Sequence, residues 1–256
     1  MVSFYIVRHG QTLLNSLDRA QGWSDSPLTD VGKQTAVELG HKLKGIDFNA
    51  AYTSDMLRAV QTAELVLGEN RSSGIPIKKD ARLREWCLGN MEAENNTVFI
   101  NNVIDWMGGA SFAELNERLP DVADVIYGHD TTGMAEPFQT IEERLKSAFT
   151  DMTRRHRVGE NSNILVVTHA FAIKTLCHLF APEQLSKVGK VKNAAVSRLI
   201  SDGGVFSLEP DYNYEKTAGK PITALLLFFS CSKVIGYTVT IFTEKLKVRT
   251  TWWLLL

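Results

Sequence analysis

Short runs of apolar and β-branched residues alternate along the chain with longer segments in which apolar residues recur every three or four positions. The short runs predict buried strands, and the longer segments predict amphipathic helices with one face toward a core. We predict strands at 2–7, 48–54 and 163–170, an extended start to 75–86, helices at 29–45, 55–67, 140–157 and 171–180, and a hairpin formed by 194–200 and 205–210.

This alternation of strands and helices is typical of βαβ units. It predicts an α/β fold, a three-layer αβα sandwich with a mainly parallel central sheet. Ligands of such sheets bind beyond the carboxyl ends of the strands. Residues 90–135 are polar and irregular, with helical patches near 96–106 and 111–119. We interpret 90–135 as an insertion that lies over a site and is not part of the core.

The composition changes after Pro221. Residues 1–221 carry 24 basic and 28 acidic side chains, whereas 222–256 carry four basic and one acidic side chain and are largely apolar. We therefore predict a folded domain at 1–221 and an atypical C-terminal extension at 222–256. Within the extension, 222–243 is long enough to span a membrane, but Lys233 near its middle makes insertion costly. A packed element, a membrane segment and an out-of-frame extension stay open, and we favour an extension outside the fold.

The net charge of -1 provides no global field that would favour nucleic acid or an anionic membrane, so any anion site must be a local cluster. The three cysteines, Cys87, Cys177 and Cys231, lie far apart and form no CxxC motif, which indicates free thiols in a reducing compartment. The first residues lack the basic and apolar regions of a signal peptide. We therefore expect a cytoplasmic protein.

Two predicted strands end in histidine, one in Arg8-His9-Gly10 and the other in Thr168-His169-Ala170. A single histidine after a strand usually has a structural role. Parallel central strands would bring these two imidazoles to the same rim, however, and Arg8 would lie beside them. Gly10 lets the backbone turn sharply, and we expect it to give a ligand room.

Two further residues complete a possible site. Arg58 lies in the first turn of a predicted helix directly after a strand, close to the same rim. Its guanidinium group offers a fork of donors that fits phosphate oxygens. Glu85 follows an extended segment and precedes Trp86, and burial there would raise its pKa and suit a general acid or base. Glu92 and Glu94 are weaker candidates for that role.

These residue types together indicate phosphoryl transfer. A neutral His9 would be the nucleophile, and Arg8, Arg58 and a protonated His169 would neutralise the phosphoryl oxygens. Glu85 would protonate the leaving oxygen and then assist the attack of water. Because the cations are side chains, we expect no metal and no other cofactor, and the sequence has no P-loop, HExxH or EF-hand motif.

The chain resembles the histidine phosphatase superfamily, with its phosphoglycerate-mutase-like fold, over about residues 1–210. Five blocks in the family's order carry this resemblance: "VRHGQTLLN" (7–15), "AQGWSDSPLTDVGKQTA" (20–36), "YTSDMLRAVQTAE" (52–64), "LREWCLGNMEAE" (83–94) and "VVTHAFAIKTL" (166–176). RHG alone is a weak signal, whereas five ordered blocks are a strong one.

The resemblance implies a role for each matching residue. His9 is the expected phosphorylated nucleophile and Glu85 the expected acid and base. The expected phosphate and substrate contacts are Arg8, Asn15, Gln21, Gly22, Arg58, His169 and Ala170, with Thr12 shaping the same loop. Domain 1–221 would then be a histidine phosphatase catalytic domain, and its partner a small phosphorylated metabolite, with no nucleic acid and no membrane.

Three departures bear on the reaction. Ala170 replaces the glycine of many members, and Asn90-Met91-Glu92-Ala93 replaces a Trp-Glu-Gly pattern on the substrate side. The Glu-Arg-His-Tyr-Gly block of cofactor-dependent mutases is Glu85-Trp86-Cys87-Leu88-Gly89 here. This difference favours a phosphatase over a mutase.

Several questions stay open on the sequence alone. A mutase that uses the same phosphoenzyme and a non-catalytic module that binds phosphorylated ligands are the alternatives to a phosphatase. A homodimer is also open. The physiological substrate is unspecified. We expect Trp23, Trp106, Phe112 and Tyr127 to be candidates for the walls of the substrate-binding site.

Overall fold

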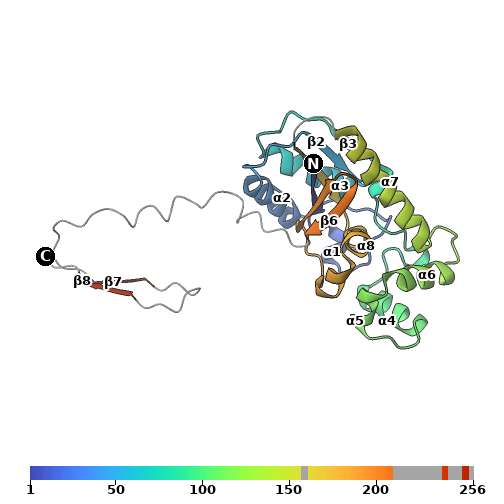
Figure 1. Ribbon diagram of the computed structural model, residues 1–256. Helices are drawn as coiled ribbons and strands as arrows, with labels where there is room; N and C mark the ends of the chain where they lie inside the picture. The colour runs from blue at the N-terminus through green and yellow to red at the C-terminus, as the bar shows by residue number, and fades with distance from the viewer. Residues whose placement is uncertain (157–160, 210–237, 242–249, 254–256) are drawn as a thin grey trace. The chain divides into compact units, whose positions relative to one another are not determined.

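The computed structural model describes residues 1–156, 161–209, 238–241 and 250–253, and the chain divides into two units, Met1–Tyr214 and Glu215–Leu256. In the first unit, six strands form a mixed sheet in the order β3-β2-β4-β1-β5-β6 (Figure 1). The strands are β1 (Val2–Arg8), β2 (Ala50–Thr53), β3 (Ile77–Lys79), β4 (Ser162–Thr168), β5 (Val196–Asp202) and β6 (Val205–Glu209). Strands β1 to β4 are mutually parallel, β5 is antiparallel to β1, and β6 is antiparallel to β5, which confirms the predicted sheet and its closing hairpin.

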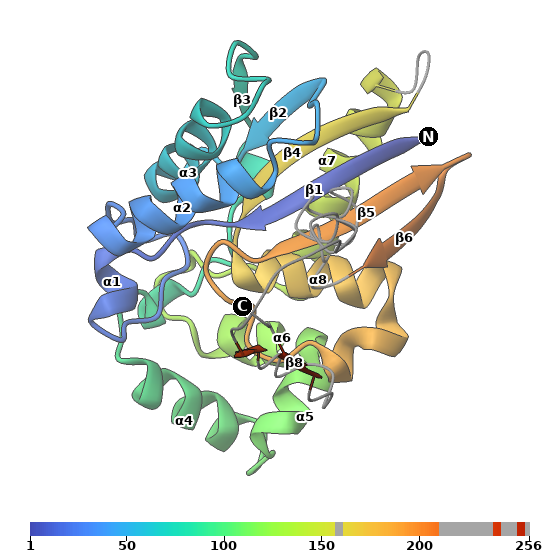
Figure 2. The ribbon, with the colours of Figure 1, turned by 90° about the vertical axis from the view of Figure 1, so that its left-hand side faces the viewer.

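Helices cover both faces of this sheet (Figure 2). The α-helices of the described first unit are α1 (Leu13–Ser16), α2 (Asp30–Lys42), α3 (Leu57–Gly68), α4 (Asn96–Trp106), α5 (Phe112–Glu117), α6 (Leu119–His129), α7 (Phe138–His156) and α8 (Ala170–Phe180). Helices α2 and α3 lie on one face, and α7 and α8 on the other. Along β1, Tyr5 and Val7 pack toward α2 and α3, whereas Phe4 and Ile6 pack toward α7 and α8. This period of two produces the predicted αβα sandwich.

The register between β1 and β4 aligns the carboxyl ends of the two strands, each of which is followed by a histidine. Arg8 pairs with Thr168, and the backbone N–H of His9 donates to the carbonyl oxygen of Thr168 at 3.0 Å. Both strands are buried on both faces, as parallel strands covered by helices must be. The carboxyl ends of β1 and β4 therefore present their next residues, His9 and His169, at one rim.

The prediction that 90–135 is not part of the core is wrong. The segment folds into α4, α5 and α6, which lie together below the sheet in both ribbon views (Figures 1 and 2). Phe99, Val103, Leu119 and Ile126 are buried in the same apolar core as one face of the sheet. Apolar residues at helical spacing drive this packing, and the surrounding polar residues mask the pattern in the sequence.

Gly10 has a different purpose from the one that the sequence suggested. A Cβ atom at Gly10 would meet the carbonyl oxygen of Gly32 at 2.6 Å, and one at Gly32 would meet the carbonyl oxygen of Gln11 at 2.1 Å. The two glycines let the start of α2 lie directly against the chain that follows β1. Gly10 thus provides space for α2, and it does not line the cavity at the rim.

In the second unit, β7 (Thr238–Ile241) pairs antiparallel with β8 (Thr250–Trp253). The rest of 222–256 lies outside the described residues, so the boundary between 1–221 and 222–256 stays a prediction. Within the part of the chain that the structure describes, every helix is too short or too polar to cross a bilayer.

The close approach of Gly10 and Gly32 yields a stability prediction. Gly32→Ala should lower the free energy of unfolding by about 1–3 kcal/mol, because its new methyl group forces two backbone segments apart. Gly45→Ala is the matched control, since nothing lies within 4 Å of its added Cβ. Urea unfolding of both variants measures the difference, and equal stability of the two would contradict this account.

Candidate active site

A cavity of about 500 Å³ opens at the carboxyl ends of β1 and β4. Its floor near the strands carries Arg8, His9 and Glu85, and Ala170 from the start of α8 adjoins them. Asn15 of α1 and Gln21 of the loop that follows line the cavity, and α4, α5 and α6 contribute a wall on the far side. Segments that lie far apart in the sequence therefore meet around one cavity.

His9 is 3% exposed, and a single hydrogen bond fixes its tautomer. Its Nδ1 lies 2.8 Å from the carbonyl oxygen of Gly10, which can only accept, so Nδ1 carries the proton. Burial, with the charges of Arg58 and Arg8, lowers the pKa of His9 well below its usual value. The ring is therefore neutral, and its Nε2 carries a free lone pair.

His169 has the opposite tautomer. It is fully buried, and Arg58 Nε donates to its Nδ1 at 3.2 Å, so the proton of the neutral ring resides on Nε2. His169 Nε2 finds no hydrogen-bond partner among the described residues. The expectation that His169 is protonated is wrong, because burial and the Arg58 charge lower its pKa well below its usual value. The ring centroids of His9 and His169 lie 5.2 Å apart.

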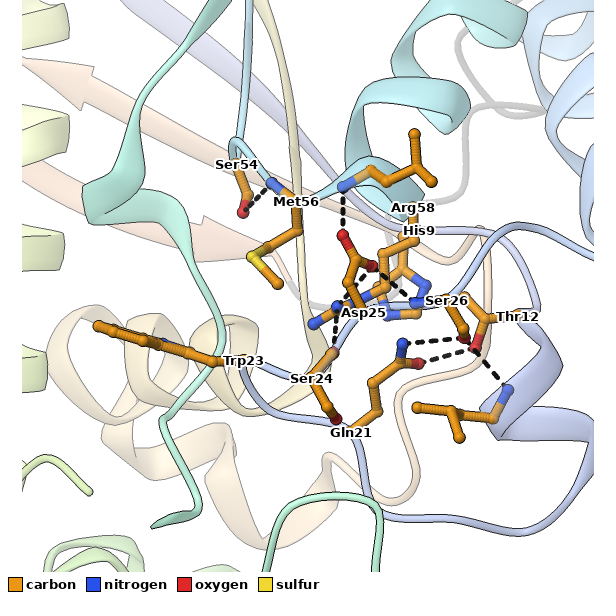
Figure 3. Close-up of polar contacts among 12 residues, drawn as sticks. His9, Thr12, Gln21, Trp23, Ser24, Asp25, Ser26, Ser54, Met56 and Arg58 are labelled. Atoms are coloured by element: carbon orange, nitrogen blue, oxygen red, sulfur yellow. Dashed lines mark hydrogen bonds and ion pairs between the residues drawn. The ribbon is translucent and has the colours of Figure 1, made fainter. Parts of the chain in front are cut away.

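Arg58 lies in the first turn of α3, as predicted, and its side chain is completely buried. Its guanidinium group donates to the carbonyl oxygen of Ser24 and forms an ion pair with Asp25 at 3.0 Å (Figure 3). It also donates to the carbonyl oxygen of Gly22. Burial lowers its pKa, although Asp25 opposes the shift. Arg58 therefore clamps the loop at 22–25 and orients His169 from behind the cavity floor, which it does not itself line.

Arg8 lines the cavity directly. Its Nη1 donates to the carbonyl oxygen of Val191 at 2.6 Å, and its buried Nε has no partner among the described residues. Burial lowers the pKa of Arg8 to about 10, opposed by Glu85, so the group stays charged at neutral pH. Buried N–H groups are rarely left unpaired, because each loses its hydrogen bonds to water. His169 does not itself line the cavity, but its ring neighbours that of His9, which does. Arg8 Nε and His169 Nε2 are thus two such groups near His9, and they suit an anionic oxygen ligand.

Glu85 is 3% exposed, and its carboxylate lies against the N-terminal end of α8. Its carboxylate accepts from the backbone N–H groups of Trp86, Phe171 and Ala172 at 2.9–3.1 Å. Burial raises its pKa, although these three donors oppose the shift. The donors hold both oxygens in place, and burial favours a proton there, which suits an acid that donates into the cavity.

The other predicted contacts divide into two groups. Asn15, Gln21 and Ala170 line the cavity. Gly22 does not line it, since its N–H donates to Glu92 and its carbonyl oxygen accepts from Arg58. Of the four aromatic residues expected as walls, only Phe112 lines the cavity; Trp23 donates to the carbonyl oxygen of Glu85, Trp106 stacks on His129 and Tyr127 is half exposed.

The structure adds residues that the sequence did not single out. Glu92, considered only as a rival acid, accepts from the backbone N–H groups of Gly22, Trp23, Ser24 and Leu88 at 2.6–3.1 Å and so holds the loop that Arg58 clamps. Asn193 donates to the carbonyl oxygen of His9 at 3.0 Å and lines the cavity. No sequence signal marks Asn193, because its segment follows neither a strand nor a motif. In the described ranges, no group of three histidine, cysteine or carboxylate side chains is placed to hold a metal ion.

Comparison with known proteins agrees with this geometry. Residues 4–210 match the histidine phosphatase superfamily (branch 1). A relative from Citrobacter koseri, named "Probable phosphoglycerate mutase GpmB", is 28% identical over 201 residues, which cover 78% of this chain and 85% of the relative.

Solved structures share the fold. A phosphoglycerate mutase from Bacillus anthracis is 34% identical, with a TM-score of 0.78 over 85% of this chain and 95% of that one. An alpha-ribazole phosphatase from Shigella flexneri, 20% identical, covers 83% of this chain and 96% of that one with a TM-score of 0.62. The chain therefore belongs to the histidine phosphatase superfamily, and its fold is phosphoglycerate-mutase-like. The superfamily match makes it an enzyme of a group that contains both phosphatases and mutases.

The role of Glu92 can be tested by substitution. Glu92→Gln removes the charge that holds four backbone N–H groups and should raise KM for a phosphomonoester about tenfold or more, because the loop clamped by Arg58 loosens. Glu38→Gln is the matched control, because Glu38 is exposed on α2, accepts from Gln34 at 3.1 Å and does not line the cavity. Steady-state kinetics of both variants measure the effect, and a similar KM for the two would refute this role.

Proposed function

We propose that the protein is a metal-independent phosphatase that hydrolyses a small phosphomonoester through a phosphohistidine at His9. The observation that supports this most directly is the opposite tautomers of His9 and His169. His9 offers the lone pair that a nucleophile needs, and His169 offers an N–H donor to the oxygens of the phosphoryl group.

The first step forms one bond and breaks another. His9 Nε2 attacks phosphorus, and the bond between phosphorus and the alcohol oxygen breaks. Glu85, whose raised pKa favours the protonated form, gives its proton to that oxygen so that a neutral alcohol leaves. The Nδ1–H bond to Gly10 shares the positive charge that develops on the ring of His9.

The second step returns the enzyme to its starting state. Water attacks the phosphorus of phosphohistidine, the N–P bond breaks, and the Glu85 carboxylate takes the proton of that water. Arg8 Nε and His169 Nε2 donate to the phosphoryl oxygens in both steps, and Arg58 adds a second positive charge behind them. The positive charge required by the reaction is thus provided by side chains of the chain itself.

A phosphoglycerate mutase is the second candidate, because the relatives at 28% and 34% identity carry that name. Both reactions share the phosphohistidine, and they differ only in the acceptor of the phosphoryl group. In the mutase the acceptor is a hydroxyl group of the bound acid, whereas in the phosphatase it is water. Formation of an isomer of 3-phosphoglycerate without release of free phosphate would favour the mutase.

Trapping of the phosphoenzyme tests the chemistry. The protein is mixed with 4-nitrophenyl phosphate in the presence of a chelator, quenched and examined by mass spectrometry. We expect an acid-labile phosphoryl group on His9 that disappears on standing and is absent from His9→Ala. His178→Ala, which changes a histidine outside the cavity, should keep the adduct. A protein that binds phosphomonoesters tightly but gives neither adduct nor phosphate would be a binding module.

The pKa shifts of His9 and Glu85 predict that kcat/KM is highest at acidic pH. His9 must be unprotonated, and its lowered pKa keeps it so below the usual histidine range. Glu85 must be protonated, so kcat/KM for benzyl phosphate should fall as the pH rises through the raised pKa of Glu85.

Glu85→Gln should lower kcat/KM for benzyl phosphate about 100-fold or more and abolish this alkaline decline. Its effect on kcat/KM for 4-nitrophenyl phosphate should be much smaller, since that leaving group departs without a proton and kcat/KM does not include the later attack of water. Equal losses on both substrates would exclude the acid role of Glu85, and circular dichroism would show whether the variant is folded.

A further inference from the structure

Beyond the phosphate end, the cavity has an extensive apolar wall. The wall is made of Leu88, Phe99, Ile100, Val103, Phe112, Leu115, Val122 and Phe171. Phe171 is held in place by stacking on Trp86, with ring centroids 4.7 Å apart. A small polyol phosphate would leave this wall in contact with water, whereas an apolar body of the substrate would displace that water favourably.

One buried cation faces the same space. Lys174 lines the cavity and is only 8% exposed. It lies four residues after Ala170 on α8, so the two share a face of the helix. Its ammonium group donates to the side-chain oxygen of Asn116 on α5, and Asn116 is itself held by its bond to the carbonyl oxygen of Phe112 at 3.2 Å. Among the described residues, Lys174 has no carboxylate within ion-pair distance.

The carboxylates of the cavity are already engaged. Glu85 accepts three backbone N–H groups, and Asp18 accepts from the side chain of Asn96 at 2.7 Å. Lys190 adds a further positive charge to the lining. A buried ammonium group with only an amide partner is costly, and burial lowers the pKa of Lys174 despite the opposing charge of Glu85. An anionic ligand group beside Lys174 would remove that cost.

We propose that the substrate is a phosphomonoester whose alcohol is a bulky apolar body carrying a second acidic group, and that Lys174, held in place by Asn116, binds this group. The phosphoryl group lies at His9, the apolar body lies against α4, α5 and α6, and the acidic group lies beside α8. A carboxylate and a second phosphate share the required chemistry. This inference rests on the proposed phosphatase function of the same site.

Binding to His9→Ala separates recognition from chemistry, because this variant lacks the nucleophile. Calorimetry would compare benzyl phosphate, its 3- and 4-carboxy derivatives, benzyl phosphate with a second phosphate on the ring, and 3-phosphoglycerate. We expect one acidic benzyl phosphate to bind about tenfold or more tightly than both benzyl phosphate and 3-phosphoglycerate. Which acidic derivative binds best identifies the carboxylate or the second phosphate.

Variants in the same background test Lys174 itself. Lys174→Met should reduce the preference for the acidic derivative over benzyl phosphate about tenfold, and Lys174→Arg should retain much of it. Lys192→Met is the control. Lys192 lies in the segment at 190–193, but its side chain is exposed and, unlike those of its neighbours, does not line the cavity. Binding of benzyl phosphate by each variant shows that its cavity is folded, and Lys174→Arg tests the charge if Lys174→Met does not fold.

Each outcome bears on one part of the inference. Equal affinities of benzyl phosphate and all its acidic derivatives would overturn the role of Lys174, and tightest binding of 3-phosphoglycerate would overturn the apolar body. Turnover is measured separately with the wild-type protein and benzyl phosphate. Failure of wild-type turnover alongside the expected order of affinities would reject the phosphatase and leave the ligand class standing.

Discussion

The site depends on the control of two imidazole tautomers by two buried hydrogen bonds. The carbonyl oxygen of Gly10 takes the Nδ1 proton of His9, while Arg58 Nε occupies the Nδ1 lone pair of His169. One ring therefore presents a lone pair and the other an N–H group, although the two residues are chemically identical. Either ring in the other tautomer would offer the wrong group to a phosphoryl oxygen or to phosphorus, so the surrounding packing serves to hold these two bonds.

That packing explains several features that have no direct contact with a ligand. The clamp of Arg58 on the loop at 22–25 needs acceptors in fixed positions, and Glu92 fixes them by binding the N–H groups of the same loop. The close approach of Gly10 to Gly32 anchors the other side of the loop. Burial, and after it the positive charge of Arg58, lowers the pKa values of both histidines, because a further positive charge in this environment is unfavourable.

The cavity combines two environments that call for different ligand chemistry. Near the strands, Arg8 Nε and His169 Nε2 have no partner among the described residues, and together with the charge of Arg8 they favour an anion. Farther out, α4, α5 and α6 present an apolar wall with Lys174 at its side. Helices α4 to α6 contribute both to the core and to this wall, so the helices that stabilise the fold also shape the cavity.

Much of the fold was predictable because it is encoded locally. The period of apolar residues indicated the strands β1, β2 and β4 and the helices α2, α3, α7 and α8, and the two short apolar runs at 194–200 and 205–210 indicated the hairpin of β5 and β6. The paired strand ends brought His9 and His169 to one rim, since parallel neighbours end together. The helices of 90–135 were only partly indicated, because their apolar faces are interrupted by polar residues that lie at the surface.

The sequence by itself determined the alternation of elements and the identity of Arg8, His9, Arg58, Glu85 and His169 as a set of residues fit for phosphoryl chemistry. Only the tertiary structure decided the tautomers of the two histidines and the neutral state of His169. It also decided the structural roles of Gly10, Gly22 and Glu92 and placed Lys174 in the cavity. The physical reason is that these properties depend on burial and on hydrogen bonds between segments far apart in the chain. Local sequence patterns encode periodicity and strand ends, but not the partner that a buried polar atom will meet.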